Sequence, residues 1–336
     1  MAKSKSIFYY ILLALTFTLV GWFSNTFYNI PKSPDNPITK VLPKPLEKYS
    51  IENLSKMHFE SGNIQIGEVV KETDKFTSYK FKFEFSPDLS EKLKTTTGLI
   101  NIPKLNGPFP VIVMYRGYVD QKIYKTGDGT RRAGEYFATN GFITISPDFL
   151  GYADSDSEAE NIFESRFQTY TTALNILSSI ENIKDWDGKN VFIWAHSNGG
   201  QIALTTLEAS GTNYPTVLWA PVSKPFPYSI LYYTDESPDH GKFIRSELSK
   251  FEQNYDTEKY SITNYFNQIK APIEIYQGTN DDAIPVEWSE ILNTNLKANN
   301  IDVDFYKYSG ADHDMNPSWS QIIESSLSFF KKNINL

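Results

Sequence analysis

The pattern of apolar and polar positions changes character along the chain. An uncharged apolar run at residues 7–23 is followed by a proline-rich stretch at 24–49. From Tyr79 to Phe85, aromatic residues then occupy every second position, and charged residues fill the positions between them. A period of two with one apolar face predicts a half-buried antiparallel strand.

From residue 111 onward, short continuous apolar runs alternate with amphipathic helical segments, which indicates βα units and a parallel sheet. The pattern therefore predicts the α/β class and an α/β-hydrolase fold, with a mostly parallel eight-stranded sheet, helices on both faces and an antiparallel start. The predicted strands are 67–73, 76–85, 97–103, 111–115, 142–146, 191–195, 216–220, 273–276 and 303–308, and the predicted helices are 131–139, 163–183, 286–298 and 319–332.

One segment, residues 221–264, interrupts the alternation between two predicted strands. In this architecture an insertion at that position forms a small cap over the active site, while the alternative is a surface excursion without a role. We therefore predict an α/β-hydrolase catalytic domain at 50–336, preceded by a proline-rich linker at 26–49, because dense prolines prevent regular secondary structure.

The amino-terminal residues 1–25 are predicted to be a membrane anchor. Lys3 and Lys5 precede the apolar run, which ends on bulky Trp22 and Phe23 rather than on the small residues that signal cleavage favours. The lysines predict a cytoplasmic amino terminus, a single-pass protein of the cell membrane and a catalytic domain on the extracytoplasmic side. The alternative is a cleaved signal peptide and a secreted protein.

Composition removes several classes of function. The net charge is −8 and the basic residues are not clustered, so we expect no nucleic-acid partner. The chain contains no cysteine and only four histidines, which excludes disulfides and thiolate metal sites and makes a histidine-rich metal centre improbable. We expect neither a metal nor a cofactor.

The candidate nucleophile is Ser197, which lies between a strand-like run and a helix-like run. Ala195 and Gly199 stand two positions before and after it, and Gly200 follows. A small-x-Ser-x-Gly pattern at a strand-to-helix turn is typical of a nucleophile elbow, which exposes the serine at the top of the sheet.

A serine nucleophile requires a base and an orienting acid, which follow it in α/β-hydrolases in the order Ser, acid, His. His313 follows the last predicted strand and is the candidate base. The acid is Asp281 or its neighbour Asp282, and the Gly-x-x-Asp-x-x-Ile-Pro spacing favours Asp281. His196 adjoins the serine, and its side chain is expected to point away from it.

The developing oxyanion requires hydrogen-bond donors. The backbone N–H of Asn198, directly after the nucleophile, is one candidate, and the N–H of Tyr118 in the loop after residues 111–115 is the other. In this loop Arg116 occupies a position where histidine is more usual, and it is interpreted either as a surface ion pair or as a substrate contact.

Five segments of the chain together carry a family resemblance: 115–118, 146–155 (with Pro-Asp-x-x-Gly-Tyr), 195–200, 277–285 and 310–313. With them the chain resembles the catalytic domain of the prolyl oligopeptidase family of serine hydrolases. The resemblance implies the triad Ser197, Asp281 and His313, and it does not imply proline specificity. Full-length oligopeptidases carry a large β-propeller ahead of the catalytic domain and few globular residues precede it here, so the resemblance implies neither a substrate size nor recognition of a substrate's amino terminus.

The sequence thus predicts a serine hydrolase that cleaves an amide (peptide) or ester bond through an acyl-enzyme, with a small molecule or a peptide as substrate. A carboxylic-ester hydrolase is the alternative within the same chemistry. The alternative from another class is a catalytically inactive surface binding module, although no triad residue is missing.

Overall fold

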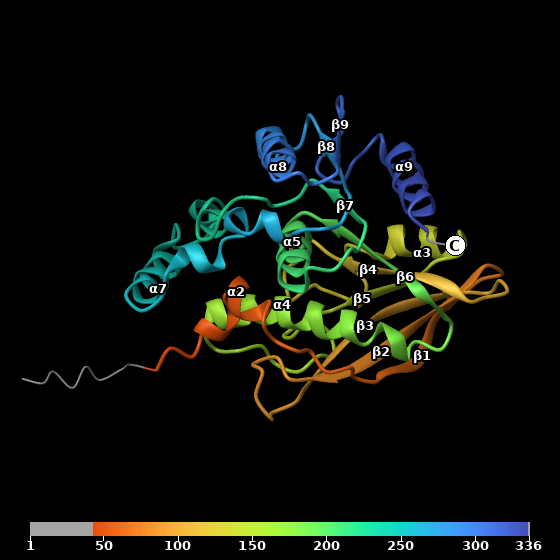
Figure 1. The fold of residues 1–336 in the computed structure, drawn as a ribbon, viewed down its shortest axis with the longest axis horizontal. Helices are drawn as coiled ribbons and strands as arrows, with labels where there is room; N and C mark the ends of the chain where they lie inside the picture. Colours follow the sequence, from red (N-terminus) through yellow and green to blue (C-terminus); the bar gives the residue numbers. More distant parts are fainter. Residues whose placement is uncertain (1–42, 335–336) are drawn as a thin grey trace, which may run out of the picture. The chain divides into compact units, whose positions relative to one another are not determined.

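The computed structural model describes residues 43–334, and its compact unit begins at Lys44 (Figure 1). The predicted anchor, with its apolar run at 7–23, lies outside the described residues and stays a prediction. Among residues 43–334, no helix is both long enough and apolar enough to cross a bilayer.

A single sheet of nine strands forms the centre of this unit, in the order β1-β2-β3-β5-β4-β6-β7-β8-β9. The pairs up to β3–β5 are antiparallel and all later pairs are parallel, as predicted. The sheet has nine strands, one for each of the nine predicted strand segments, rather than the eight given for the predicted fold. The strands are β1 (Ile64–Glu72), β2 (Phe76–Phe85), β3 (Lys94–Pro103), β4 (Phe109–Tyr115), β5 (Ile143–Pro147), β6 (Trp186–His196), β7 (Thr216–Trp219), β8 (Ile273–Gly278) and β9 (Val303–Tyr308).

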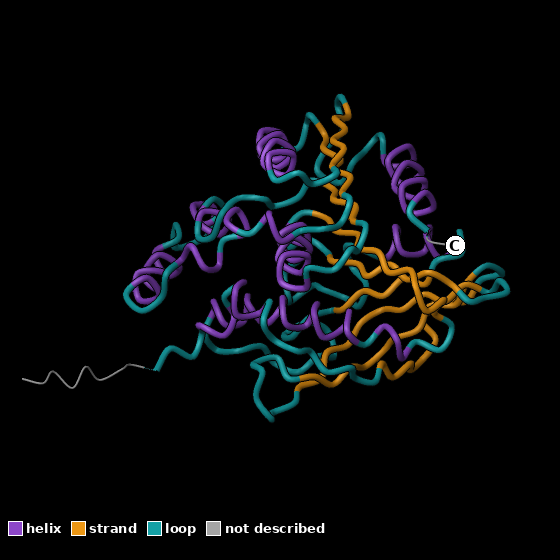
Figure 2. The backbone as a smooth tube through the Cα atoms, in the orientation of Figure 1, coloured by secondary structure: helices purple, strands orange, loops and turns teal. Residues whose placement is uncertain are grey.

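Helices cover both faces of the sheet (Figure 2). Helices α3 and α9 pack on one face, and α4, α5 and α8 pack on the other. The α-helices are α2 (Ile51–Leu54), α3 (Arg131–Thr139), α4 (Ile162–Ser178), α5 (Asn198–Ser210), α6 (Tyr228–Leu231), α7 (Lys242–Glu252), α8 (Val286–Ala298) and α9 (Trp319–Lys332). The short 3-10 helices are η1 (Glu47–Tyr49), η2 (Ile180–Asn182), η3 (Thr234–Glu236), η4 (Thr257–Tyr260), η5 (Ile262–Asn264) and η6 (Phe266–Gln268).

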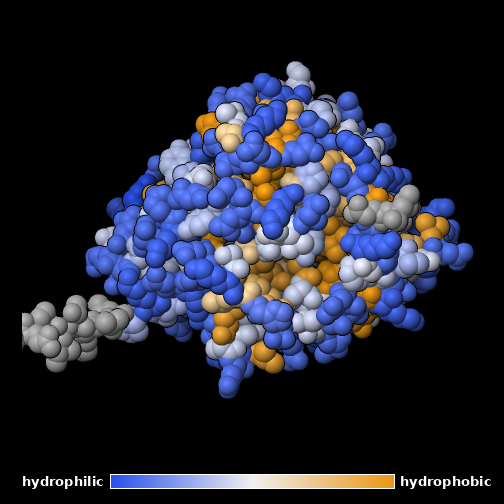
Figure 3. Space-filling model, in the orientation of Figure 1, coloured by the Kyte–Doolittle hydropathy of each residue, from blue (hydrophilic) through white to orange (hydrophobic). Residues whose placement is uncertain are grey.

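Strand β4 shows why the central strands are continuously apolar. Val111 and Val113 enter the core beneath α4 and α5, whereas Ile112 and Met114 enter the core beneath α3 and α9, and all four are fully buried. Successive side chains point to opposite faces, so a strand covered on both faces needs apolar residues throughout. The face of the molecule in Figure 3 is mostly hydrophilic, with apolar side chains gathered toward its centre.

The carboxyl end of the predicted linker belongs to the folded unit. Leu46 and Tyr49 are buried, and the Tyr260 hydroxyl donates a hydrogen bond to the Leu46 carbonyl at 3.0 Å. The boundary predicted at residue 49 is therefore wrong, and the compact unit begins at Lys44. Prolines exclude regular secondary structure, but they do not prevent the apolar residues between them from packing into a core.

The insertion at 221–264 packs beside the sheet rather than forming a strand. Phe226 contacts Phe163 of α4 edge to face at 5.7 Å between ring centroids. At its other side the Tyr233 hydroxyl donates a hydrogen bond of 3.3 Å to the carbonyl of Ala283, in the loop after β8. The insertion therefore borders the loop that carries Asp281, while its role as a cap over the active site stays a prediction.

Helix α5 contains a buried acid, Glu208, which is 1% exposed. Neither carboxyl oxygen has a hydrogen-bond partner within the described part of the chain. Burial raises the pKa of Glu208 well above its ordinary value, because a carboxylate loses its hydration in an apolar interior. In the folded protein Glu208 therefore stays protonated at pH values at which the same carboxyl group is already ionised in the unfolded chain.

We expect Glu208→Gln to flatten the dependence of stability on pH. Below about pH 4 both states of the wild type hold this proton, whereas above it only the folded state does. The wild-type free energy of unfolding should then fall by up to about 1.4 kcal/mol per pH unit until the folded pKa is reached, and the variant lacks this decline. Urea unfolding between pH 4 and 8 measures both slopes, with the exposed Glu324→Gln as the control. Parallel curves for wild type and Glu208→Gln would contradict the assignment.

Candidate active site

Ser197 lies at the sharp turn where β6 ends and α5 begins. Its backbone has φ 55° and ψ −122°, a strained combination for a residue with a side chain. The turn is closed so tightly that a Cβ on Gly199 would lie 2.1 Å from the Tyr115 carbonyl oxygen. The Ser197 N–H donates to the Trp219 carbonyl at 2.9 Å, which ties the turn to β7. The serine is thus fixed at the rim formed by the carboxyl ends of the parallel strands.

The loop after β4 lies against this serine. A Cβ on Gly117 would stand 2.9 Å from the Ser197 Cβ, so only glycine allows the approach. Asn198 begins α5, and Tyr118 follows Gly117 with a 76% exposed side chain. Across residues 43–334, neither the N–H of Asn198 nor that of Tyr118 donates a hydrogen bond. Both predicted oxyanion donors are therefore unengaged and close in sequence to groups that contact Ser197.

The loops after β8 and β9 bring Asp281 and His313 together. The His313 Nδ1 lies 3.0 Å from each carboxylate oxygen of Asp281. A backbone hydrogen bond from Asn280 to the Ala311 carbonyl, at 2.9 Å, holds the two loops in this position. Because an ionised carboxylate only accepts hydrogen bonds, Nδ1 carries the proton and Nε2 is left as an acceptor.

Asp281 is a buried carboxylate whose charge is stabilised by donors. Its side chain is 0% exposed. Burial by itself raises its pKa, but hydrogen bonds from His313 and from the N–H groups of Ile284 and Ala283 outweigh burial and hold the pKa below its ordinary value. The alternative acid, Asp282, is exposed to solvent. Of the two candidate acids, the structure therefore places only Asp281 against His313.

Ser197 is close to this pair without being bonded to it. The ring of His196, the residue before the serine, lies 4.7 Å from the ring of His313 between centroids. No hydrogen bond joins the Ser197 hydroxyl to His313 in the described part of the chain. Catalytic hydrogen bonds often tighten only when substrate binds, so this geometry is compatible with a serine–histidine pair.

His196 positions His313 from behind, which sequence reasoning did not predict. Its Nε2 lies 2.9 Å from the His313 carbonyl oxygen. A carbonyl only accepts, so Nε2 is the protonated nitrogen. Burial, followed by the nearby His313, lowers the pKa of His196 to about 4, which keeps this ring neutral at neutral pH. No signal in the sequence connects residue 196 to a backbone oxygen 117 positions later.

Arg116 has a different role from either of the two predicted for it. It is 6% exposed, and its guanidinium donates to the carbonyls of Gly117 at 2.9 Å and Asp148 at 3.0 Å. The same group lies 3.9 Å from the ring centroid of Tyr152. Arg116 therefore holds the loop after β4 against the segment after β5. This structural role replaces both predicted roles, the surface ion pair and the substrate contact.

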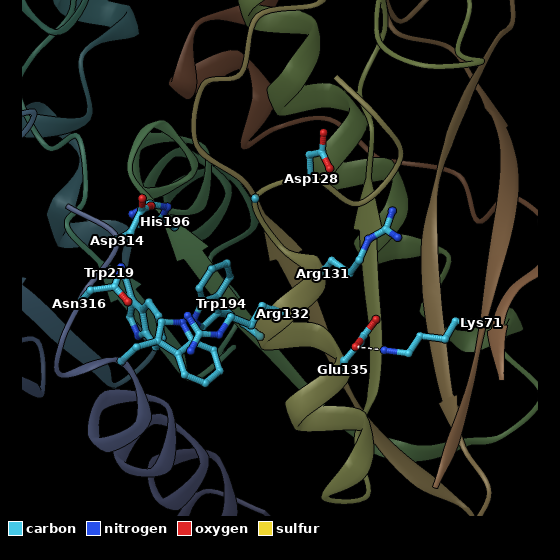
Figure 4. Close-up of a pocket in the computed structure, with 13 residues that line it drawn as sticks. Lys71, Asp128, Arg131, Arg132, Glu135, Trp194, His196, Trp219, Asp314 and Asn316 are labelled. Carbon is cyan, nitrogen blue, oxygen red and sulfur yellow. Dashed lines mark hydrogen bonds and ion pairs between the residues drawn. The ribbon is translucent and has the colours of Figure 1, made fainter. Parts of the chain in front are cut away.

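Two cavities approach the site from opposite sides. One of about 190 Å³ lies between α4 and the turn, lined by Asn198, Tyr118 and apolar residues that include Ile202. The other, of about 640 Å³, lies behind His196 between α3 and α9 (Figure 4). Figure 4 shows His196 at its edge and Trp194 and Trp219 at its floor. The smaller cavity is lined by both residues that carry the candidate oxyanion donors, and Asn198 directly follows Ser197 in the chain.

The larger cavity, of about 640 Å³, contains charged residues without forming a metal site. Glu135 and Lys71 are joined as an ion pair at one end (Figure 4). Arg132 lies over the Trp319 ring, 3.6 Å from its centroid. Across the described residues, no group of three or more histidines and acids is arranged to hold a metal ion.

Comparisons with known proteins agree with the fold and the chemistry of this site. Residues 131–336 match the model of the prolyl oligopeptidase family. An acetyl esterase, Axe7A, of Xylanibacter ruminicola is 24% identical over 243 residues, which are 66% of this chain and 52% of that protein. An uncharacterized peptidase, YtmA, of Bacillus subtilis is 25% identical over 200 residues, which are 59% of this chain and 74% of that protein. The chain thus spans about half the length of the esterase relative.

Solved structures of related shape include two acetyl xylan esterases. Acetyl xylan esterase 1 of Thermoanaerobacterium sp. JW/SL YS485 has a TM-score of 0.60 at 15% identity, covering 88% of this chain and 99% of its own. The acetyl xylan esterase of Paenibacillus sp. R4 has a TM-score of 0.62 at 16% identity, with the same two coverages. At these identities the likeness confirms the α/β-hydrolase fold.

Proposed function

The chain belongs to the prolyl oligopeptidase family, and from that premise we propose that it is a serine hydrolase that cleaves esters or amides of short acyl groups through an acyl-enzyme on Ser197. The observation that carries the proposal is the bidentate contact of His313 with the buried Asp281 carboxylate, next to a serine in a strained strand-to-helix turn.

In the first half-reaction, the Ser197 hydroxyl attacks the substrate carbonyl while His313 Nε2 accepts its proton. Asp281 holds the imidazole by Nδ1 and stabilises the positive charge that develops on it. The tetrahedral oxyanion accepts hydrogen bonds from the N–H groups of Asn198 and Tyr118, the unengaged donors beside the serine. His313 then returns the proton to the leaving alcohol or amine, and the acyl group remains on Ser197.

In the second half-reaction, water takes the place of the leaving group. His313 accepts a proton from water, the resulting hydroxide equivalent attacks the acyl-enzyme, and the proton returns to the Ser197 oxygen as the acid departs. The positioning contacts of His196 and Arg116 keep the His313 loop and the loop after β4 in place during both steps.

The cavity beside Asn198 and Tyr118 supports short acyl groups. Its volume of about 190 Å³ is less than a third of the 640 Å³ of the cavity behind His196. The carbonyl of an ester bound there lies between the serine and both donors. A peptide bond would use the same groups, and the likeness to an uncharacterized peptidase keeps peptidase activity as the second candidate.

A substrate panel tests the proposal. We expect 4-nitrophenyl acetate and butyrate to be hydrolysed with a higher kcat/KM than 4-nitrophenyl octanoate, because the cavity ends before a long chain does. Aminoacyl and dipeptidyl 4-nitroanilides measure the amide activity in the same assay. Hydrolysis of 4-nitroanilides without hydrolysis of esters would favour the peptidase, and inactivity on the whole panel would favour a binding module.

The proposal also retains the location predicted from the amino-terminal sequence. The apolar run at 7–23 would anchor the protein in the cell membrane, with the catalytic domain on the extracytoplasmic side. Its support is the uncharged run preceded by Lys3 and Lys5.

A further inference from the structure

The cavity beside the proposed nucleophile contains an arginine whose charge is not neutralised. Arg166 of α4 lines this cavity together with Asn198. Within the described part of the chain it forms no ion pair, and the one hydrogen bond of its guanidinium runs from Nη2 to the Gln201 Oε1 at 2.6 Å. A partly buried guanidinium without a carboxylate is unusual, because burial of an unpaired charge is unfavourable.

Two donors near this arginine lack hydrogen-bond partners. The Arg166 Nε is buried without a partner, and so is the Nε2 of Gln201, a residue that is 1% exposed. The Gln201 Oε1 already accepts from Nη2, which leaves its amide group as a second donor. Arg166 is thus the positively charged residue of the lining and its Nε has no partner, while Gln168 in the same lining has an unpartnered Oε1. An unpaired guanidinium favours an anionic ligand.

The acid that also lines the cavity is occupied elsewhere. Glu158 accepts hydrogen bonds from Gln121 at 2.9 Å and from the Ser165 hydroxyl at 2.6 Å, one at each carboxylate oxygen. Within the described residues it forms no ion pair with Arg166, whose guanidinium donates to Gln201 instead. The remaining wall is apolar, with Leu150 and Ile202 both buried. An apolar wall and a charged end suit a short carbon chain that terminates in a carboxylate.

We propose that Arg166 is a specificity-determining residue that makes this cavity select acyl groups ending in a carboxylate, such as the hemi-esters of short dicarboxylic acids. The inference rests on the proposed hydrolase function. The reacting ester carbonyl lies at Ser197, and the distal carboxylate pairs with the Arg166 guanidinium. The bond changes are those of ordinary ester hydrolysis. Water cleaves the acyl–oxygen bond to give the dicarboxylic acid and the alcohol, and the distal carboxylate is unchanged.

The test compares charged and neutral acyl groups of matched length. Release of benzyl alcohol is measured from monobenzyl succinate, glutarate and adipate, and from benzyl pentanoate, hexanoate and heptanoate. The ratio of kcat/KM for the charged ester to that for its neutral partner should exceed one in the wild type. Arg166→Met should lower this ratio about 10- to 100-fold, the size expected for loss of one charge-assisted hydrogen bond. Arg166→Lys should retain part of it.

Arg132→Met is the matched control, because Arg132 is an exposed arginine that lines the other cavity. It removes the same charge and should leave the ratio unchanged. If Arg166→Met lowers kcat/KM for charged and neutral esters equally, Arg166 only supports Gln201 and the inference is overturned. Thermal melting identifies a variant that fails to fold, and Arg166→Lys then decides the outcome.

Binding without turnover separates this inference from the proposed function. Titration calorimetry of Ser197→Ala with monobenzyl glutarate should give a Kd about tenfold or more lower than that of Ser197→Ala/Arg166→Met. Equal Kd values would overturn the role of Arg166 even if the enzyme hydrolyses esters. A wild type that hydrolyses no ester, but whose Ser197→Ala form binds the acid through Arg166, would refute the hydrolase and leave the binding site standing.

Discussion

Ser197→Ala should lower kcat/KM for ester hydrolysis roughly 10⁴- to 10⁶-fold, because no other described group at the turn can form the acyl-enzyme. The residual rate would come from binding and from the oxyanion donors alone. Alanine fits the turn, since the loss of one oxygen leaves the backbone at φ 55° and the packing of Gly199 unchanged. The measurement is steady-state hydrolysis of 4-nitrophenyl butyrate, with covalent labelling by a fluorophosphonate probe as a second readout.

The matched control for this prediction is Ser328→Ala, on the exposed side of α9, where the hydroxyl bonds only to the Glu324 carbonyl. Labelling and turnover should be kept in this variant and lost in Ser197→Ala. A labelled, active Ser197→Ala protein would locate the nucleophile elsewhere and would remove the basis for the proposed mechanism.

The fold could be predicted from the sequence because its periodicity follows directly from burial. In β4 every residue from Val111 to Tyr115 is fully buried, and an uninterrupted apolar run is what a strand covered on both faces requires. The turn at Ser197 was predictable for a related reason. A Cβ on Gly199 would clash with the Tyr115 carbonyl, so a glycine at this position indicates that the two backbone segments approach closely.

The parts that could not be predicted depend on contacts between distant segments. Arg116 looked like a surface or substrate residue, and only the fold brings the Asp148 carbonyl and the Tyr152 ring around it. The acid Glu208 occupies an apolar environment that its neighbours in sequence do not reveal. The boundary at residue 49 failed because proline density reports on secondary structure and not on whether Leu46 is buried.

The choice between the adjacent acids Asp281 and Asp282 shows both what the sequence predicts and what only the fold decides. Spacing alone favoured Asp281 over Asp282, but neighbouring residues after a strand can exchange roles with a small change in the loop. The structure separates them by environment, since Asp281 is buried against His313 and Asp282 is exposed. The pair allows a test in which the two variants each remove one negative charge at neighbouring positions.

Asp281→Asn should lower kcat about 10³- to 10⁴-fold, whereas Asp282→Asn should change it less than about twofold. The amide can present an N–H to His313, which favours the tautomer with its proton on Nε2 and removes the base that Ser197 needs. It also withdraws the negative charge that stabilises the imidazolium. The measurement is kcat for 4-nitrophenyl butyrate in both variants, at a pH where the wild type is fully active.

The stability of the same variants gives an independent check with a defined sign. The pKa of Asp281 is held below its ordinary value, so its ionised form stabilises the fold above about pH 4, and this contribution is lost as pH falls through the folded pKa. The free energy of unfolding of Asp281→Asn should therefore lie below that of the wild type at pH 7, and the difference should shrink in acid. Asp282→Asn should follow the wild-type curve throughout. If Asp282→Asn instead loses activity and Asp281→Asn keeps it, the acid has been assigned to the wrong residue, and the contact between His313 and Asp281 would be structural.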